Sequence, residues 1–294
     1  MLLKHYKGHF FNSLQNIHEE QEIESFFFIL TEYLHHLKRV DVALQPYFEL
    51  SDSDIQKWNA IVSDLQQEKP IQYITGETWF YGLRFQVNEN TLIPRPETEE
   101  LVEWIIESQK SNVQSQTLAI LDIGTGTGCI PISLKTNILQ ANVSAIDVSE
   151  HALEVTKRNA ELNNVEINFI QANILEVQDL SQLSTPNSQL RTNFDIIVSN
   201  PPYVRNLEKQ EIKKNVLDYE PHLALFVEDT DALLFYRKIA QLALKNLSPN
   251  GLLFFEINQY LGNETVELLK KLGFKNIELK KDLYGNDRMI KCEK

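Results

Sequence analysis

Five consecutive residues in the second half of the chain have the chemistry and the stiffness to hold a flat amino group. Ser199-Asn200-Pro201-Pro202-Tyr203 follows the apolar run Phe194-Asp195-Ile196-Ile197-Val198, which is typical of a short buried strand. Because each proline lacks a backbone N–H and fixes φ, the chain leaves this strand along a rigid path. The Asn200 side-chain oxygen and the Pro201 carbonyl could accept both hydrogens of one planar NH2 group, and Tyr203 could stack on its plane. Taken alone, the segment is more typical of a proline-rich turn, so its meaning depends on the rest of the chain.

A glycine-rich turn earlier in the chain is a candidate cofactor site. Leu121-Asp122-Ile123-Gly124-Thr125-Gly126-Thr127-Gly128-Cys129 follows a predicted strand and begins a predicted helix, so its glycines allow close approach of a ligand to helix N–H groups. Dinucleotide-binding turns have the spacing G-x-G-x-x-G, whereas this turn has D-x-G-x-G-x-G. The Asp122 carboxylate adds nothing to a phosphate site, but it favours a cation. The pattern therefore favours S-adenosylmethionine, which carries a sulfonium and an amino group, over NAD.

Polar residues also end the next two predicted strands. Asp147 lies roughly twenty residues beyond the glycine turn, where an acid commonly bonds ribose hydroxyls; it could equally cap the helix that starts near Glu150. Asn173 follows the third strand and could accept a hydrogen bond from an adenine amino group. Because ligands of open α/β sheets bind at the carboxyl ends of the strands, these residues and Asn200 are expected to share one crevice.

The elements that must position these residues alternate between strand and helix from Leu118 onward, with helices expected at 149–163 and 230–247, for example. Such alternation predicts an α/β fold with a mostly parallel sheet covered by helices on both faces. Residues 181–193, rich in Ser, Gln, Asn and Thr, are expected to form a loop. We expect strands at 118–123, 142–147, 165–171, 194–199, 251–257, 275–280 and 288–292.

The N-terminal quarter has a different pattern. Residues 1–75 are expected to form a small helical bundle that holds a partner protein, with an N-cap at Ser51-Asp52-Ser53-Asp54. Residues 76–96 are expected to form a β-hairpin and linker, and 97–294 the sheet domain with a first helix from about Glu97 to Gln109. Arg95, held between two prolines, is placed for a fixed contact, or it is a solvated side chain in the loop before the helix.

The composition of the chain argues against several classes of protein. The chain has 294 residues, a formal net charge of −13 and two cysteines, Cys129 and Cys292, without metal-ligand or disulfide spacing. The acidic balance argues weakly against a non-specific nucleic-acid binder. The polar N-terminus is not typical of a signal peptide and the apolar runs are too short for a membrane span, so we expect a cytoplasmic protein with no membrane partner.

Together these motifs resemble the protein-(glutamine-N5) methyltransferases that modify peptide-chain release factors. The resemblance runs nearly end to end and rests on Leu92-Ile-Pro-Arg-Pro-Glu-Thr-Glu99, Asp122-Ile-Gly-Thr-Gly-Thr-Gly128, Asn200-Pro-Pro-Tyr203, Tyr219-Glu-Pro221, Phe255-Glu-Ile257 and Asp282 through Arg288. Asn-Pro-Pro-Tyr alone is shared with enzymes that methylate amino groups of nucleic acids. The chain departs from the family at Asn173, where an Asp is frequent, and at Asn258, where a Gly is common.

The resemblance implies a class I, Rossmann-like methyltransferase sheet with six parallel strands and an antiparallel last-inserted strand, and a role in translation termination. The substrate it implies is the glutamine of the Gly-Gly-Gln motif of release factors. We separately expect no metal, no stable nucleic-acid binding and a monomeric enzyme. The residues expected to hold S-adenosylmethionine are Asp122, Gly124, Thr125, Gly126, Gly128, Asp147, Asn173 and Asn200. Those expected to hold the glutamine and act in catalysis are Asn200, Pro201, Pro202 and Tyr203, with Arg95 as a further substrate contact.

Two alternatives stay open on the sequence. An adenine-N6 or guanine-N2 methyltransferase would grip a flipped base with the same Asn-Pro-Pro-Tyr segment. The nearby cations Arg205, Lys209, Lys213 and Lys214 could then contact phosphates, although acidic neighbours are more typical of a solvated face. A non-catalytic protein that binds S-adenosylmethionine is the second alternative.

Overall fold

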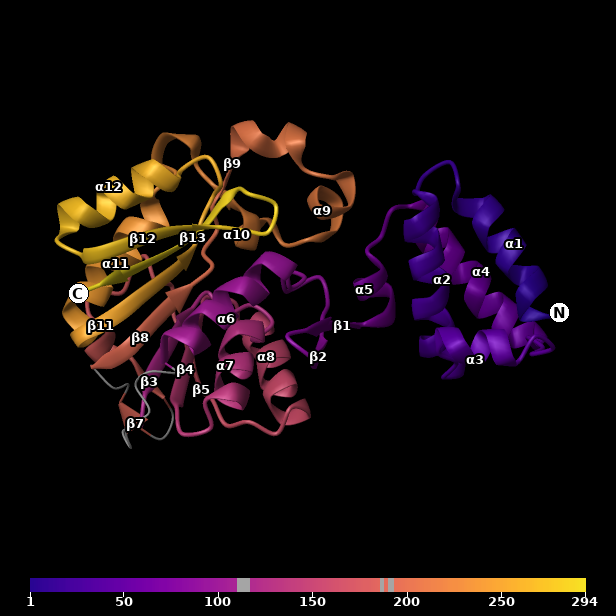
Figure 1. Ribbon diagram of the computed structural model, residues 1–294, viewed down its shortest axis with the longest axis horizontal. Helices are drawn as coiled ribbons and strands as arrows, with labels where there is room; N and C mark the ends of the chain where they lie inside the picture. The colour runs from indigo at the N-terminus through magenta and orange to yellow at the C-terminus, as the bar shows by residue number, and fades with distance from the viewer. Residues whose placement is uncertain (110–116, 186–187, 190–192) are drawn as a thin grey trace. The chain divides into compact units, whose positions relative to one another are not determined.

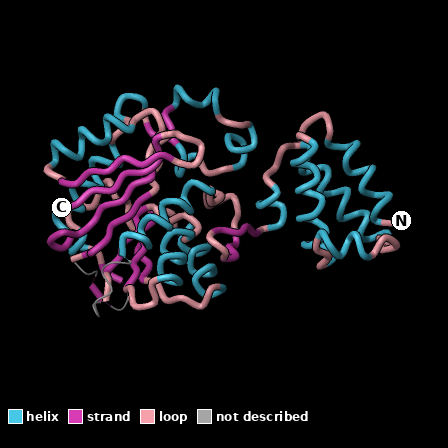
Figure 2. Tube along the Cα trace, viewed as in Figure 1, coloured by secondary structure: helices cyan, strands magenta, loops and turns pink. Residues whose placement is uncertain are grey.

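The computed structural model describes residues 1–109, 117–185, 188–189 and 193–294 (Figure 1). Backbone contacts divide the described chain into two units: residues 1–76 with 213–219, and residues 77–212 with 220–294. Figure 2 shows that the first unit is built from helices and that the long strands all belong to the second. No helix within the described residues combines the length and the apolar character needed to cross a membrane.

The first unit is a helical bundle with its own apolar core. Its buried side chains include Phe10, Phe27, Leu30 and Trp58, and the Trp58 indole N–H donates to His35 Nε2 at 2.9 Å. The expected N-cap is confirmed, because Ser51 Oγ accepts from the Asp54 N–H. The helices of this unit are α1 (Leu3–Leu14), α2 (Glu20–His35), α3 (Arg39–Leu44), α4 (Asp52–Gln66), α5 (Ile71–Thr75) and α9 (Lys214–Tyr219).

The second unit is organised by a seven-stranded sheet, in the order β12-β13-β11-β8-β3-β4-β5. β13 runs antiparallel to both of its neighbours, while the other pairs are parallel, so the sheet of a class I methyltransferase is confirmed. The strands are β3 (Ala119–Ile123), β4 (Asn142–Asp147), β5 (Asn168–Gln171), β8 (Phe194–Ser199), β11 (Leu247–Glu256), β12 (Lys275–Lys281) and β13 (Asp287–Glu293).

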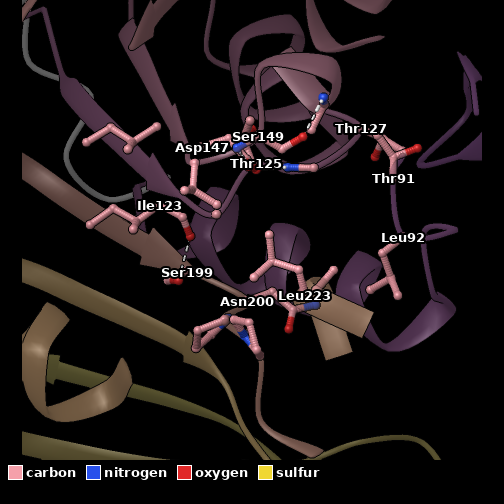
Figure 3. Close-up of a pocket in the computed structure, with 18 of the residues that line it drawn as sticks. Thr91, Leu92, Ile123, Thr125, Thr127, Asp147, Ser149, Ser199, Asn200 and Leu223 are labelled. Carbon is pink, nitrogen blue, oxygen red and sulfur yellow. Dashed lines mark hydrogen bonds between the residues drawn. The ribbon is translucent and has the colours of Figure 1, made fainter. Parts of the chain in front are cut away.

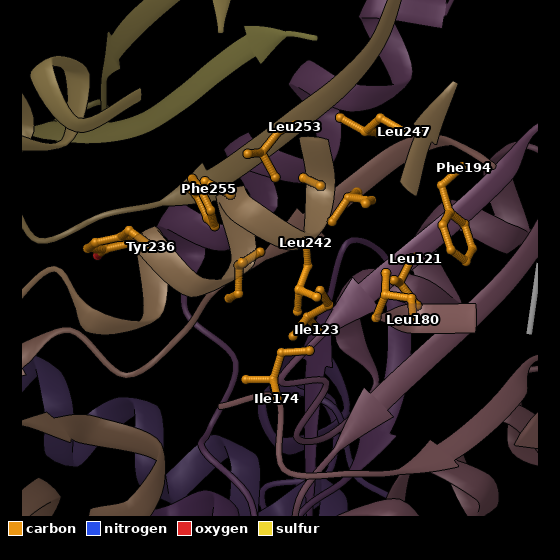
Figure 4. Close-up of a cluster of buried hydrophobic side chains, with 14 of the residues drawn as sticks. Leu121, Ile123, Ile174, Leu180, Phe194, Tyr236, Leu242, Leu247, Leu253 and Phe255 are labelled. Carbon is orange, nitrogen blue, oxygen red and sulfur yellow. The ribbon is translucent and has the colours of Figure 1, made fainter. Parts of the chain in front are cut away.

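Helices cover both faces of this sheet because the strand side chains alternate between two apolar clusters. Leu121 and Phe255 of the sheet share one cluster with Tyr236 and Leu242 of α11 (Leu234–Asn246) (Figure 4). The helix α12 (Gly262–Leu272) contributes Leu269 to the same cluster. Ile120, Ile196 and Phe254 join the other cluster, which is covered by α6 (Pro96–Gln109), α7 (Cys129–Asn137) and α8 (Glu150–Leu162).

Shorter elements complete the unit. β1 (Glu77–Phe80) and β2 (Leu83–Gln86) pair as the expected hairpin, whose turn residues Tyr81 and Gly82 both have positive φ. β9 (Val204–Arg205) pairs with β10 (Phe226–Val227), next to η3 (Asn206–Glu211), α10 (His222–Leu225) and η4 (Asp229–Asp231).

Three expected boundaries differ from the structure by three residues or more, and the others agree to within one residue. β5 begins at Asn168 rather than at 165, and α11 begins at Leu234 rather than at 230. β11 begins at Leu247, because it pairs with Phe194 before an irregularity at Asn250, whose φ is 61°. Within the expected loop 181–193, residues 186–187 and 190–192 lie outside the described residues; the described part forms η2 (Leu180–Gln182) and the paired β6 (Ser184–Thr185) and β7 (Ser188–Gln189).

The register of the sheet decides which residues meet at its carboxyl edge. Ser199 lies opposite Ile123 on one side and Phe255 on the other, and its hydroxyl donates to the Ile123 carbonyl at 2.6 Å. The next residue of each strand therefore emerges at the same level. These residues are Gly124, Asn200 and Glu256, at the ends of β3, β8 and β11.

Candidate active site

A cavity of about 350 Å³ opens at this carboxyl edge, a size typical of small-molecule sites. Figure 3 shows Thr125, Asp147 and Ser149 gathered on one side of it, with Asn200 beside Leu223 on another. The expected residues that line it are Arg95, Gly124, Thr125, Gly126, Asp147, Asn173, Asn200, Pro201 and Pro202. Asp122, Gly128 and Tyr203 are sequence neighbours of lining residues but are not themselves among the described residues that line the cavity.

The three glycines of the turn have two different roles. All have positive φ: 79° at Gly124, 55° at Gly126 and 81° at Gly128. A Cβ added at Gly126 would meet nothing within 4 Å, and one at Gly124 would meet only the Asn200 carbonyl oxygen, at 4.0 Å. A Cβ at Gly128 would instead lie 2.4 Å from Thr156 Cγ2. Gly124 and Gly126 therefore keep space open above the turn, whereas Gly128 allows α8 to pack against it.

The turn is held in place by side chains from β4 and α8. Asp147 Oδ2 accepts from the Gly126 N–H at 2.8 Å, and its Oδ1 accepts from the Ser149 N–H at 2.9 Å. The N-cap of α8 is Ser149, whose hydroxyl oxygen accepts from the Ala152 N–H. Burial raises the pKa of Asp147. Each of its carboxylate oxygens keeps a further lone pair, so the side chain can still accept from a ligand.

Two α8 side chains complete this support. The Thr156 hydroxyl donates to the Gly126 carbonyl at 2.7 Å, and Asn159 Nδ2 donates to the Thr127 carbonyl at 2.9 Å. Asn159 also exchanges hydrogen bonds with the backbone N–H and carbonyl of Gln86, at the end of β2. The hairpin, the turn and α8 are thus joined through one buried amide.

Asp122 is a buried acid without a partner. The side chain is fully buried, neither carboxylate oxygen has a hydrogen-bond partner, and burial raises its pKa to about 7. The Thr125 hydroxyl is buried close to Asp122, and its proximity partly offsets the rise in the pKa of Asp122. Buried polar groups are normally satisfied, and an unpaired carboxylate is stabilised by a nearby cation. This orphaned acid under an open glycine turn fits a cationic nucleoside such as S-adenosylmethionine.

Behind Asn200 lies a chain of hydroxyl and carboxylate contacts. Asn200 Nδ2 lies 3.4 Å from Thr98 Oγ1, the Thr98 hydroxyl donates to Glu256 Oε2 at 2.6 Å, and the Tyr203 hydroxyl donates to Glu256 Oε1 at 3.0 Å. Glu256 is only 1% exposed, and burial raises its pKa, partly offset by the two hydroxyl donors. The hydroxyl of Tyr203 is therefore engaged behind the Asn-Pro-Pro segment, and burial raises its pKa well above the usual range.

A second buried acid joins two segments that line the cavity. Glu220, 3% exposed, accepts from Arg95 Nη2 at 2.5 Å and from the Ile93 N–H at 3.2 Å. Of the two sequence alternatives for Arg95, the structure has a fixed contact, and its partner is Glu220. Among the described residues that line the cavity, Arg95 is the single basic one, so the cavity favours a neutral or cationic ligand.

Sequence reasoning assigned no role to five residues of this site: Thr98, Thr156, Asn159, Glu220 and Glu256. Three of them, Thr98, Glu220 and Glu256, lie in motifs that carry the family resemblance, and Glu256 also follows the apolar run Leu252–Phe255 just as Asp147 follows an apolar strand. Thr156 and Asn159 look like ordinary polar positions of an amphipathic helix. Their role depends on which loop packs against α8, and no local pattern gives that contact.

Comparison with known proteins gives consistent results along the chain. A family model described as PrmC N-terminal domain matches residues 9–76, and one described as Methyltransferase small domain matches residues 105–222. A release factor glutamine methyltransferase from Flavobacterium psychrophilum is 61% identical over 291 residues, covering 99% of both chains. A protein of the same name from Bacteroides thetaiotaomicron is 39% identical over 278 residues, covering 95% of both.

A solved structure agrees on the fold. The hMettl16 catalytic domain, in complex with the MAT2A 3'UTR hairpin 6, superposes with a TM-score of 0.54 at 16% identity, covering 82% of each chain. At this identity the similarity concerns the architecture of the sheet and its helices alone.

Proposed function

Since this chain belongs to the release factor glutamine methyltransferase family, we propose that its cavity transfers a methyl group from S-adenosylmethionine to the side-chain nitrogen of the glutamine in the Gly-Gly-Gln motif of a release factor. The observation that carries the proposal is the close approach of two parts of the cavity, the glycine turn and the Asn-Pro-Pro segment, which we call its two half-sites. The Asn200 carbonyl oxygen lies 4.0 Å from the point where a Gly124 side chain would begin. The glycine turn and the Asn-Pro-Pro segment therefore adjoin within one cavity.

We assign the cofactor to the half-site of the glycine turn. S-adenosylmethionine supplies an electrophilic methyl group on a cationic sulfur, with a neutral thioether as leaving group. Gly124, Thr125 and Gly126 give it backbone contact, and Asp147 accepts from its ribose with its remaining lone pairs. Asp122, behind the turn, adds a negative field, and Gly128 sets the packing that shapes it.

Asn173 is assigned to the adenine, through its backbone. Its Nδ2 donates to Glu176 Oε1 at 2.9 Å and its Oδ1 accepts from the Leu175 N–H at 3.1 Å. These bonds fix the loop, so we propose that the backbone N–H of Asn173 serves a ring nitrogen and that the remaining lone pair of its Oδ1 accepts from the adenine amino group.

We assign the substrate glutamine to the Asn-Pro-Pro half-site. Asn200 Oδ1 and the Pro201 carbonyl accept the two amide hydrogens, and Pro202 keeps the segment rigid. An amide nitrogen is a poor nucleophile because its lone pair is delocalised. Holding it in line can supply on the order of 7–11 kcal/mol in favourable cases. The proton leaves after transfer, when the nitrogen has become acidic, so no general base is assigned.

Arg95 and Tyr203 support this half-site rather than the reacting atoms. Arg95 is fixed by Glu220 and shapes the wall of the cavity, and its aliphatic stem remains available to the substrate. Tyr203 is anchored through its hydroxyl to Glu256.

We propose that the protein partner is recognised by the N-terminal region. Residues 1–75 are assigned to partner binding, 76–96 to the hairpin and linker, and 97–294 to methyl transfer by a monomer. The rival activity on nucleic acid has no specific observation in its favour. Arg205, the first of the cations that could contact phosphates, is paired with Glu208 at 2.8 Å.

The test of these assignments is Asn200→Ala in the full chain. Loss of one catalytic hydrogen-bonding group of this kind costs about 10²–10³ in kcat, so transfer of labelled methyl to a release factor should fall by at least that factor. Cofactor binding, measured by calorimetry, should persist. The matched control is Asn193→Ala, because Asn193 is exposed just before β8, at the end opposite Asn200. Loss of cofactor binding in Asn200→Ala, or full activity, would overturn the assignment.

A further inference from the structure

We propose that Glu256 is a positioning residue that fixes which end of the Asn200 amide faces the substrate, acting through the Thr98 hydroxyl. Glu256 does not line the cavity among the described residues, and the proposed chemistry does not use it. The inference rests on the proposed role of Asn200 and deepens it, because it names the group that makes Asn200 an acceptor rather than a donor.

The sheet brings the two residues together. Phe255 of β11 lies opposite Ser199 of β8 in a parallel pair, so Glu256 and Asn200 leave the sheet side by side. Thr98 reaches them from the first turn of α6 and is 2% exposed, while Glu256 is 1% exposed. All the groups involved lie in the second unit. The bond between Thr98 and Glu256 is therefore shielded from water, while Asn200 faces the cavity.

The direction of the hydrogen bonds follows from the chemistry of the carboxylate. An ionised carboxylate can only accept, so the hydroxyls of Thr98, at 2.6 Å, and Tyr203, at 3.0 Å, must both donate to Glu256. Each hydroxyl has one proton. Thr98 Oγ1 consequently has only lone pairs left for Asn200, 3.4 Å away.

This fixes the amide of Asn200. Only its NH2 end can face an oxygen that has no proton to give, so Oδ1 is the end left for the substrate. A glutamine NH2 needs an acceptor there. Were the amide reversed, two donors would face each other and the substrate nitrogen would be turned away from the methyl group.

Burial raises the pKa of Glu256, whereas the two hydroxyl donors and the charge of Arg288 favour its ionised form. Arg288 favours the carboxylate, and its own Nε donates to Asp282 at 3.0 Å, which keeps it in place. The carboxylate of Glu97 opposes it. A charge held in this way defines one hydrogen-bond direction, whereas a neutral amide at the same position would allow two.

The test compares Glu256→Gln, Thr98→Val and Thr98→Ser with the wild-type full chain. Glu256→Gln and Thr98→Val should each lower kcat for release-factor methylation about 100-fold, the scale of a misplaced reactant, with the Kd for S-adenosylmethionine unchanged. Thr98→Ser keeps the hydroxyl and should retain most of the activity. The double variant Glu256→Gln/Thr98→Val should be no worse than either single variant, because both break the same relay.

A second readout separates orientation from general damage. A release factor with glutamate in place of the glutamine presents acceptors where the wild-type substrate presents donors. In Glu256→Gln the ratio of the two Kd values should shift by about tenfold towards the glutamate form, whereas a collapsed site would weaken both alike. The thermal unfolding midpoint shows whether Glu256→Gln folds. If it does not, the comparison of Thr98→Val with Thr98→Ser tests the proposal.

The outcomes distinguish this inference from the proposed function. No methylation by the wild type would contradict the proposed function itself. An active wild type, an inactive Asn200→Ala and a Glu256→Gln variant within twofold of wild type would overturn only the role of Glu256. Equal loss in Thr98→Ser and Thr98→Val would also overturn it, because the methyl group rather than the hydroxyl would then matter.

Discussion

Three buried acidic side chains near the ends of strands organise this site, and each does so in a different way. Asp147 accepts a hydrogen bond from the glycine turn, and Glu256 accepts from the two hydroxyls behind Asn200. Asp122 is buried without a close hydrogen-bond partner. All three have a raised pKa because they are buried. Their arrangement places negative charge where a cation is expected and rigid acceptors where an amide is expected.

The orphaned Asp122 gives a pH-dependent stability. Its pKa is about 7 when folded, against about 3.9 in an unfolded chain, so between these values the folded state binds more protons. The free energy of unfolding should therefore fall as pH rises from about 4 to 7, by on the order of 4 kcal/mol for this one group. Urea unfolding without cofactor should show that Asp122→Asn stabilises the protein more at pH 8 than at pH 5. An equal effect at both pH values would contradict this, and Asp52→Asn, at an exposed position, is the control.

The same acid should couple cofactor affinity to pH. A cation near Asp122 favours the carboxylate, so binding of S-adenosylmethionine to the wild type should tighten as pH rises through about 7. Calorimetry on Asp122→Asn should give weaker binding with this pH dependence removed. An unchanged pH dependence in the variant would assign it to another group.

A substitution at Pro201 distinguishes the contribution of backbone rigidity from that of hydrogen bonding to the substrate. Pro201→Ala keeps the carbonyl that is proposed to accept from the substrate but frees φ, which costs roughly 0.4–1 kcal/mol of chain entropy. We expect kcat/KM for the release factor to fall only a few-fold, far less than in Asn200→Ala. A loss as large as that of Asn200→Ala would mean that backbone stiffness, not the amide oxygen, dominates.

At the scale of residues, the sequence predicted the lining of the cavity well and its supports poorly. Asn200, Asp147 and the glycine turn carry local signals, since each follows an apolar run with unusual chemistry. Thr98 sits in the first turn of a helix, where a hydroxyl is ordinary, and its contact with Glu256 spans 158 residues of sequence. Such a contact depends on the register of β11 against β8, which no local pattern contains.

At the scale of elements, the glycine turn makes a sharp prediction. Gly128→Ala places a Cβ 2.4 Å from Thr156 Cγ2, so it should lower the free energy of unfolding by about 1–3 kcal/mol from overpacking, in addition to backbone strain. Gly126→Ala meets open space but retains the strain of a positive φ, so it should cost about 1–2 kcal/mol of stability while weakening cofactor binding.

Denaturant unfolding and calorimetry on both glycine variants would check this division. If Gly126→Ala proved the more destabilising of the two, the packing role assigned to Gly128 would be wrong. Gly8→Ala, within α1 and open to added volume, is a control that should be neutral or stabilising.

The order and type of the main elements followed from periodicity, but their limits did not. Pro249-Asn250-Gly251 is typical of a turn, so the sequence predicted a strand from 251, whereas β11 passes through it with an irregular register. Likewise, Lys213–Tyr219 groups with the first 76 residues, and its Tyr219 hydroxyl donates to the Gln67 carbonyl at 3.0 Å. Long-range packing decides both the start of β11 and the unit to which Lys213–Tyr219 belongs.

At the scale of the whole molecule, the two units have separate cores, and every residue proposed to bind cofactor lies in the second. Leu30→Ala removes a fully buried side chain from the first core and should cost about 2–5 kcal/mol there. The Kd for S-adenosylmethionine should remain unchanged, whereas KM for the release factor should rise. A comparable loss of cofactor affinity would show that the cofactor site depends on the first unit.

Methylation of a purified release factor tests the central claim most directly. Labelled S-adenosylmethionine is incubated with the wild-type factor, with a factor whose Gly-Gly-Gln glutamine is changed to alanine, and with DNA and RNA. We expect label on the wild-type factor alone, located on that glutamine by mass spectrometry. Label on nucleic acid with none on the release factor would contradict the account and favour the base-methylating alternative.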